Sequence, residues 1–159
     1  MKKITFFLSA LLMTVAASAA APKVVMEFNS QAAVNAWNFT ETSTYINHDT
    51  IFTNGTYSIK MVWSGVAKEG CKIVMSQTDT AIIFGKKNAA LVLPKFDFAV
   101  AKIVTYGAEN ASGSTVMNVF VGDKEVSTAT TGCKVSNTYM IASDYQAAGN
   151  IYSLKITSA

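Results

Sequence analysis

The side chains that could perform catalysis are few and widely spaced in this sequence. His48 is the single histidine, and Asp49 follows it directly, so the two side chains point to opposite faces if this segment is a strand. A Ser-His-Asp triad needs a carboxylate that orients the imidazole and a serine within hydrogen-bond reach of it. The sequence contains no G-x-S-x-G motif, and neither cysteine has a histidine neighbour in the chain. The residue pattern therefore predicts a protein that is not an enzyme.

The acidic residues do not follow the spacing of a metal site or of a glycosidase. Asp97 lies between two phenylalanines, and Asp123 and Glu125 flank an expected turn. A glycosidase requires two carboxylates about 5 to 9.5 Å apart in a cleft, and ten acidic residues can supply such a pair by chance. The sequence has no D-x-D-x-D-G loop of the kind that binds calcium. We therefore assign no metal site and expect no cofactor.

Aromatic side chains provide the main indication of a function. A flat aromatic face can pack against the C–H side of a sugar ring, while a carboxylate or amide beside it hydrogen-bonds the sugar hydroxyls. The candidate ligand-binding residues combine these kinds of side chain and are Trp37, Tyr45, Asp49, Asn54, Tyr57 and Trp63. Together they predict a glycan as the partner.

The alternative for these aromatic residues is a place in the core. Trp63 continues the apolar alternation of Ile59 and Met61, so its ring fits an interior position. The other tryptophan also lies among apolar residues. The two tyrosines lie near an expected hairpin and are better candidates for exposure. Both readings remain open from the sequence.

Cys71 and Cys133 are the two cysteines of the chain. An even number of cysteines in an exported protein predicts a disulfide, because export takes them to an oxidising compartment. This bridge would close a loop of about 60 residues and stabilise the fold by about 4 kcal/mol in the chain-entropy model. The alternative is a pair of buried free thiols.

The N-terminus predicts export from the cytoplasm. Lys2 and Lys3 precede an apolar run over residues 4–15, and Ala17-Ser18-Ala19 supplies the small residues that a signal peptidase requires. We expect residues 1–19 to be a signal peptide and residues 20–159 to form one domain. The apolar run is too short to span a bilayer, so the mature protein is expected to be secreted or periplasmic without membrane insertion.

The charge of the chain argues against nucleic acid as a partner. Of the 13 basic residues, two leave with the signal peptide, so 11 stand against 10 acidic residues and the mature charge is about +1. All the basic residues are lysines. Proteins that read phosphates or base edges favour the bidentate fork of arginine.

Short β-rich runs recur through the chain and are separated by Gly, Asn, Asp and Ser, which predicts an all-β antiparallel sandwich. The expected strands are 23–28, 37–41, 44–52, 56–64, 71–76, 81–84, 89–93, 100–106, 115–121, 125–130, 138–142 and 151–157. Asn54-Gly55 predicts a hairpin, because both residues tolerate positive φ. The runs 100–106 and 115–121 are the most continuously apolar, so we expect them at central positions.

Three segments, LPKFDFAVAKIVTYG, MNVFVGDKEVSTATTG and ASDYQAAGNIYSLKITS, follow one another between Leu93 and Ser158. As an ordered series they resemble a β-sandwich module of secreted and surface proteins in gut-type Gram-negative bacteria. The resemblance implies a jelly-roll-like sandwich that acts outside the cell as an accessory or binding unit. That family usually continues into one more strand, so the resemblance also implies an unpaired edge at strand 151–157.

These observations predict a non-catalytic secreted binding module, with carbohydrate as the first candidate ligand. The alternative is a protein-interaction or structural, adhesive unit that pairs through an exposed edge strand. A small hydrolase is a more distant alternative. Two or more exposed aromatic residues beside polar side chains would favour the glycan, whereas a long bare edge strand would favour a protein partner.

Overall fold

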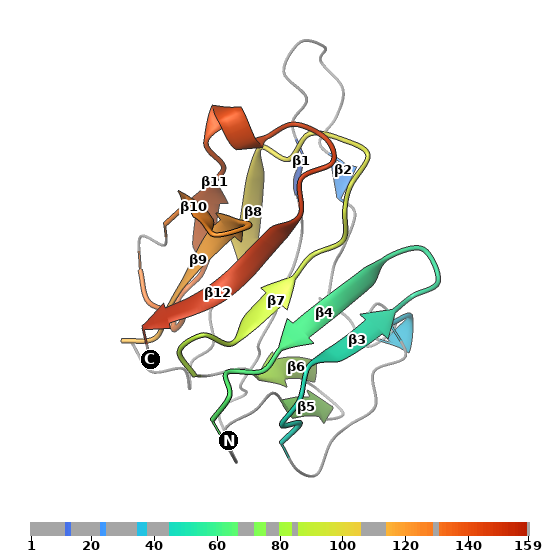
Figure 1. Ribbon diagram of the computed structural model, residues 1–159, viewed down its shortest axis with the longest axis vertical. Helices are drawn as coiled ribbons and strands as arrows, with labels where there is room; N and C mark the ends of the chain where they lie inside the picture. The colour runs from blue at the N-terminus through green and yellow to red at the C-terminus, as the bar shows by residue number, and fades with distance from the viewer. Residues whose placement is uncertain are drawn as a thin grey trace.

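The computed structural model describes side chains in residues 35–37, 45–66, 86–105, 114–128 and 131–158, and backbone alone in 12–13, 23–24, 72–75 and 80–83. The strands of these segments pair antiparallel throughout (Figure 1). The first six strands are β1 (Leu12–Met13), β2 (Lys23–Val24), β3 (Thr50–Thr53), β4 (Ser58–Val62), β5 (Lys72–Met75) and β6 (Thr80–Ile83). They are followed by β7 (Ala90–Val92), β8 (Lys102–Thr105), β9 (Val116–Val121), β10 (Lys124–Ser127), β11 (Asn137–Met140), the short 3-10 helix η1 (Ser143–Tyr145) and β12 (Tyr152–Ser158). The predicted all-β, antiparallel class is confirmed.

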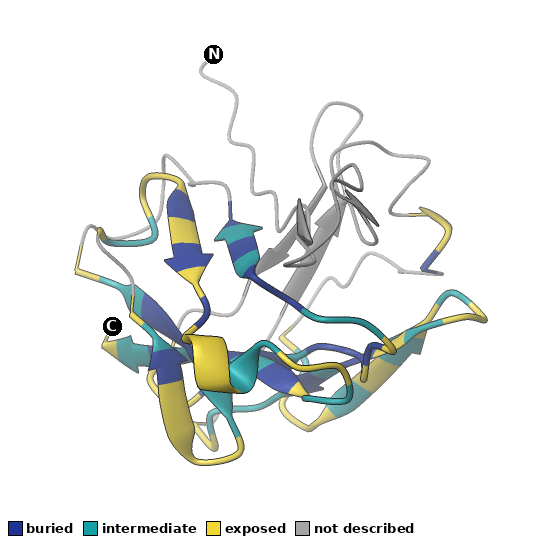
Figure 2. Ribbon diagram, turned by 90° about the horizontal axis from the view of Figure 1, so that it is seen from above, coloured by how far each residue is buried: buried dark blue, intermediate teal, exposed yellow. Residues whose placement is uncertain are grey.

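The largest sheet has six strands in the order β10-β9-β12-β7-β4-β3. Three further pairs, β1–β2, β5–β6 and β8–β11, form two-stranded sheets. The β8–β11 pair lies on one side of the six-stranded sheet (Figure 2). Inward-facing residues of both sheets, such as Ile103, Tyr139 and Leu154, belong to one hydrophobic core. Both sheets therefore contribute side chains to the same core.

Along the strands of the six-stranded sheet, side chains that face the core alternate with side chains that face away from it. Ile59 and Met61 are buried in β4, as are Tyr152, Leu154 and Ile156 in β12. The residues between them are less buried and face away from the core, which gives the colour changes along the strands in Figure 2. This period of two is the pattern that the sequence predicts for strands with one buried face.

The position of the last strand differs from the expectation. The family resemblance implied that residues 151–157 form an unpaired edge, but β12 lies between β9 and β7 and pairs with both. Its buried face carries three large side chains, Tyr152, Leu154 and Ile156, which belong to the core. Among the described strands, the edges of this sheet are β3 and β10. The interpretation of an edge at the C-terminal strand is therefore wrong.

The two apolar runs expected at central positions, 100–106 and 115–121, lie in different sheets, as β8 and β9. β9 is paired on both sides, by β10 and β12. β8 pairs with β11 in the second sheet, and no other described strand pairs with it. Apolar composition predicted burial correctly for the inner face of β8, but it did not predict which strands lie beside it.

The hairpin between β3 and β4 forms where it was predicted, with its turn shifted by one residue. The backbone N–H of Asn54 donates to the carbonyl of Tyr57 at 3.2 Å, so Gly55 and Thr56 are the central residues. Gly55 has a φ of 88°, which glycine adopts without steric cost. The Asn54 carboxamide oxygen accepts the N–H groups of Thr56 at 3.0 Å and Tyr57 at 2.8 Å. These side-chain hydrogen bonds explain why asparagine precedes the turn instead of occupying its centre.

Most of the predicted signal peptide lies outside the described residues. Within the part of the chain that the structure describes, no helix is long and apolar enough to cross a membrane. The strand expected at 37–41 also lies largely outside these residues.

Candidate functional site

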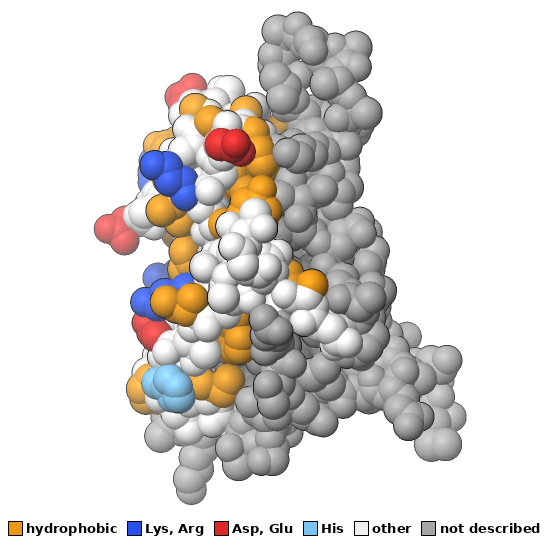
Figure 3. All heavy atoms as spheres, turned by 90° about the vertical axis from the view of Figure 1, so that its right-hand side faces the viewer, with side chains coloured by type: hydrophobic (Ala, Val, Ile, Leu, Met, Phe, Trp, Pro, Cys, Tyr) orange, Lys and Arg blue, Asp and Glu red, His pale blue; other side chains and the backbone are white. Residues whose placement is uncertain are grey.

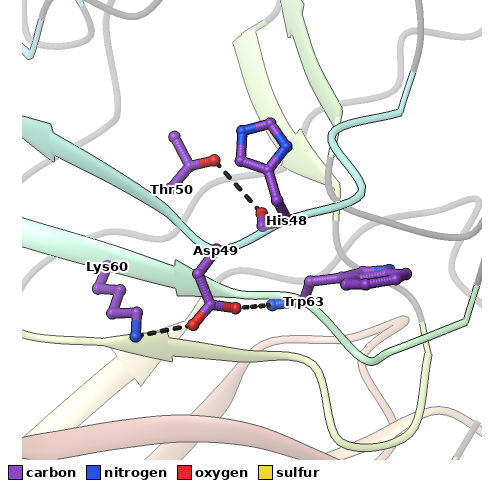
Figure 4. Close-up of polar contacts among 5 residues, drawn as sticks. All are labelled: His48, Asp49, Thr50, Lys60 and Trp63. Carbon is purple, nitrogen blue, oxygen red and sulfur yellow. Dashed lines mark hydrogen bonds and ion pairs between the residues drawn. The ribbon is translucent and has the colours of Figure 1, made fainter.

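A polar cluster lies at the open end of the β3–β4 hairpin. Asp49 directly precedes β3, Lys60 lies within β4, and Trp63 directly follows β4. The Asp49 Oδ2 atom lies 2.7 Å from Lys60 Nζ. Its Oδ1 atom accepts the backbone N–H of Trp63 at 3.0 Å (Figure 4). One carboxylate therefore connects both strands of the hairpin.

The register of the hairpin explains this cluster. Ile51 pairs with Lys60, and Thr50 pairs with Met61. Asp49 and Lys60 consequently face the side of the sheet away from the core as diagonal neighbours, within reach of a long side chain. Their side chains are 45% and 44% exposed, so the pair is open to solvent. A ligand at this surface could reach both charges.

The Asp49 carboxyl group is ionised at neutral pH. Its hydrogen bond with Lys60 lowers its pKa most, the N–H of Trp63 lowers it further, and desolvation opposes both. On the face of the molecule drawn in Figure 3, charged side chains of both signs lie among hydrophobic and uncharged ones. Among the described residues of that face, the charges do not gather into a patch of one sign.

The indole of Trp63 is held in place at the end of β4. Its Nε1–H donates to the carbonyl of Val66 at 3.0 Å, and the Val66 N–H donates to the Ser64 hydroxyl at 3.3 Å. The ring is half-buried and extends away from Asp49 (Figure 4). The turn at 63–66 thus gives the ring a defined orientation while part of it stays accessible.

His48 does not join this cluster through its imidazole. Figure 4 shows the imidazole on the opposite side of the strand from the Asp49 carboxylate. The backbone carbonyl of His48 accepts the Thr50 hydroxyl at 3.4 Å. The two side chains therefore lack the arrangement of a catalytic His-Asp pair.

Five of the six predicted ligand-binding residues separate into three groups. Asp49 and the Trp63 backbone lie together, whereas Asn54 and Tyr57 lie at the turn of the hairpin, about 16 Å away by the rise of the five residue steps from Asp49 to Asn54. Trp37 is only 3% exposed and belongs to the core. The prediction that its ring is an exposed face for a sugar is therefore wrong. Its indole removes a large apolar area from water there.

The tyrosines also differ from each other. Tyr45 is 45% exposed. Tyr57 is half-buried and meets Phe96 edge to face at 5.7 Å, and Phe96 stacks on Phe98 at 4.9 Å. Tyr57 therefore serves mainly to pack the hairpin against the loop that follows β7. Asn54 likewise has a structural role, because its carboxamide oxygen holds the turn.

Lys60 is the site residue that the sequence analysis missed. Its alternation with Ile59 and Met61 placed it on the outer face, but many outward lysines have no role beyond solvation. Lys60 can be recognised as a partner of Asp49 only when the hairpin register is known, because the register makes the two residues diagonal neighbours. That register depends on a turn one residue away from the expected one.

Cys133 has a free thiol in this structure, and it packs half-buried against the core. Burial raises the pKa of this thiol. Cys71 lies outside the described residues, so the predicted bridge between the two remains a prediction. In the described part of the chain, no cluster of three His, Cys, Asp or Glu side chains could hold a metal ion.

Comparisons with known proteins do not place this chain in a family. No family model matches it, and neither curated proteins nor solved structures give a match.

Proposed function

We propose that this protein is a non-catalytic carbohydrate-binding module and that Asp49, Lys60 and Trp63 form its contact surface. The observation that carries the proposal is a partly exposed indole, oriented by its own hydrogen bond, on the residue whose backbone N–H donates to the Asp49 carboxylate of an exposed ion pair. Sugar-binding sites combine an aromatic face for the C–H side of the ring with charged or amide groups for the hydroxyls.

The hydrogen bond of the indole favours stacking in two ways. The Nε1–H group already has its partner in Val66, so a sugar that covers the ring does not leave this donor unsatisfied. The ring is also oriented before the ligand arrives, which reduces the entropy lost on binding. Trp63 therefore offers apolar area to a sugar with little loss of entropy and without an unsatisfied hydrogen-bond donor.

The ion pair supplies the polar contacts. Each Asp49 oxygen accepts one hydrogen bond from the protein and retains a lone pair for a sugar hydroxyl. Lys60 donates one hydrogen to Asp49, and its ammonium group has three. A neutral sugar with adjacent hydroxyl groups matches this arrangement, because the two protein charges already balance each other.

Loss of the Trp63 ring should abolish glycan binding. We expect Trp63→Ala to weaken affinity at least tenfold, because a stacked aromatic is typically among the dominant contacts of an interface. Binding of the purified protein would be screened on a glycan array and measured by calorimetry. Met140→Ala is the matched control, since Met140 is 63% exposed and lies on β11, in the other sheet. Unchanged affinity in folded Trp63→Ala would refute the proposed site.

We also propose that the protein acts outside the cytoplasm, in the periplasm or in the medium. The charged start, short apolar run and Ala17-Ser18-Ala19 support removal of residues 1–19 as a signal peptide. An extracellular position suits a module that meets polysaccharide.

The alternative function is a protein-interaction unit that pairs through an edge strand. One observation favours it: β3 is an edge of the six-stranded sheet and carries Ile51, which is 67% exposed. An edge strand with an exposed apolar residue can recruit another chain by β-augmentation.

A further inference from the structure

The two edges of the six-stranded sheet differ in how they resist pairing. β10 carries Lys124 and Glu125, and its register shifts between Glu125 and Ser127. Charges and bulges of this kind block indiscriminate edge-to-edge contact. β3 has neither, because its sequence is Thr-Ile-Phe-Thr and its four residues pair with β4 without a shift. Among the described strands of this sheet, β3 is therefore the edge without a block.

The side chains of β3 divide between the two faces of the sheet. Phe52 packs against the core. Ile51 points to the opposite face and, at 67%, is the most exposed large apolar side chain in the described part of the chain. An isoleucine at an edge gains most by burial against a neighbouring strand.

We infer that β3 pairs with β3 of a second copy of this chain, antiparallel, across a two-fold axis at Ile51. In this register Ile51 lies opposite the partner's Ile51, and Thr50 lies opposite the partner's Phe52. Residues that face each other then project to the same side of the joined sheet, as antiparallel pairing requires. The contact is isologous and closes as a dimer.

Charges do not oppose this arrangement. Asp49 lies opposite the partner's Thr53, so the two Asp49 side chains sit at opposite ends of the contact. Each is also balanced by Lys60 of its own chain at 2.7 Å. The joined β3 strands thus place no like charges directly opposite each other, which would otherwise repel the copies.

The dimer is expected to be weak. A four-residue strand gives a short ladder, and small interfaces belong to reversible complexes that form and separate with concentration. Dilution should therefore dissociate it. The inference concerns assembly and does not depend on the proposed glycan site.

Cross-linking tests the register directly. Opposed residues of an antiparallel pair have Cα atoms about 4.5 to 5.5 Å apart, within the range that a disulfide spans. Ile51→Cys should therefore form a covalent dimer under mild oxidation. Thr53→Cys, on the same strand and face, is the matched control, because in this register its two copies lie about 14 Å apart along the strand.

Sedimentation velocity over about 1 µM to 1 mM protein tests the dimer without a covalent bond. The unchanged chain should shift from monomer to dimer, and Ile51→Lys should remain monomeric, because two lysines would meet on the axis. Met140→Lys, at an exposed apolar position of the other sheet, should dimerise as before. Circular dichroism would confirm that each variant is folded.

The opposite results would overturn the inference. A chain that stays monomeric across the range with no Ile51→Cys cross-link has no β3 contact. Dimer loss in Met140→Lys, or a Thr53→Cys cross-link without one at Ile51, would assign the interface or the register elsewhere.

Discussion

Asp49 binds both Lys60 of β4 and the backbone N–H of Trp63 through its one carboxylate. Lys60 and the Trp63 N–H lower its pKa below the ordinary value of 3.8. A carboxyl group with a lowered folded-state pKa stabilises the protein above its unfolded pKa, and this contribution disappears as the pH falls through the folded value. Since the pair is exposed, the effect should be less than about 1 kcal/mol.

We therefore expect Asp49→Asn to lower the free energy of unfolding slightly at pH 7. The difference from the natural chain should shrink as the pH falls below 3.8 and vanish below the lowered folded-state pKa of Asp49. Urea denaturation at a series of pH values would measure it. Asp123→Asn, in the exposed turn after β9, controls for the loss of one negative charge. A difference that persists at low pH would mean that Asp49 acts through packing.

Tyr139 presents the opposite situation, a polar group inside the core. Its side chain is fully buried in β11, and its hydroxyl has no hydrogen-bond partner in the structure. Desolvation raises the pKa of Tyr139 to about 12, and the nearby Cys133 adds to the rise. The Thr105 hydroxyl offsets part of this rise without reaching hydrogen-bonding geometry.

Removal of this hydroxyl should be tolerated or beneficial. We expect Tyr139→Phe to increase the free energy of unfolding by about 1 kcal/mol at pH 7, because an unsatisfied buried polar group is costly. A raised folded-state pKa stabilises the protein below pH 10, and that contribution is lost between pH 10 and about 12. The natural chain should therefore lose stability over this range more steeply than Tyr139→Phe. Destabilisation by the substitution at pH 7 would reveal a partner for the hydroxyl.

At the scale of elements, the β3–β4 hairpin positions the candidate site, and Asn54 holds its turn. Its carboxamide oxygen accepts two backbone N–H groups, from Thr56 and Tyr57. Asn54→Ala should lower the free energy of unfolding by about 1 to 2 kcal/mol, because both bonds are lost. Asn54→Asp retains the acceptor and should have a smaller effect. Chemical denaturation would compare them, and equal losses would show that the oxygen is not the stabilising group.

At the scale of the whole molecule, the question is whether a disulfide joins Cys133 to Cys71, which is distant in the sequence. Burial raises the pKa of the Cys133 thiol, and the thiolate is the reactive form. A reduced, folded protein should therefore be alkylated at Cys133 much more slowly than the unfolded protein. Intact mass after alkylation in denaturant, without reduction, tests the bridge to Cys71. The addition of two alkyl groups to the exported protein would rule it out.

The sequence alone predicted properties that repeat along a strand. It predicted the all-β class, the hairpin at Asn54-Gly55 and the buried alternation of Ile59 and Met61, because a strand turns its side chains with a period of two. It also predicted that His48 and Asp49 would face opposite ways (Figure 4). Each of these properties depends on residues close together in the chain.

Only the tertiary structure decided which strands are neighbours. β12 lies between β7 and β9, although an apolar alternating strand reads the same at an edge. Likewise, Phe96 comes to Tyr57 from a distant segment. Lys60 meets Asp49 only in the register of the hairpin. Such contacts depend on how all the buried faces fit together in one core, and a local pattern does not specify that packing.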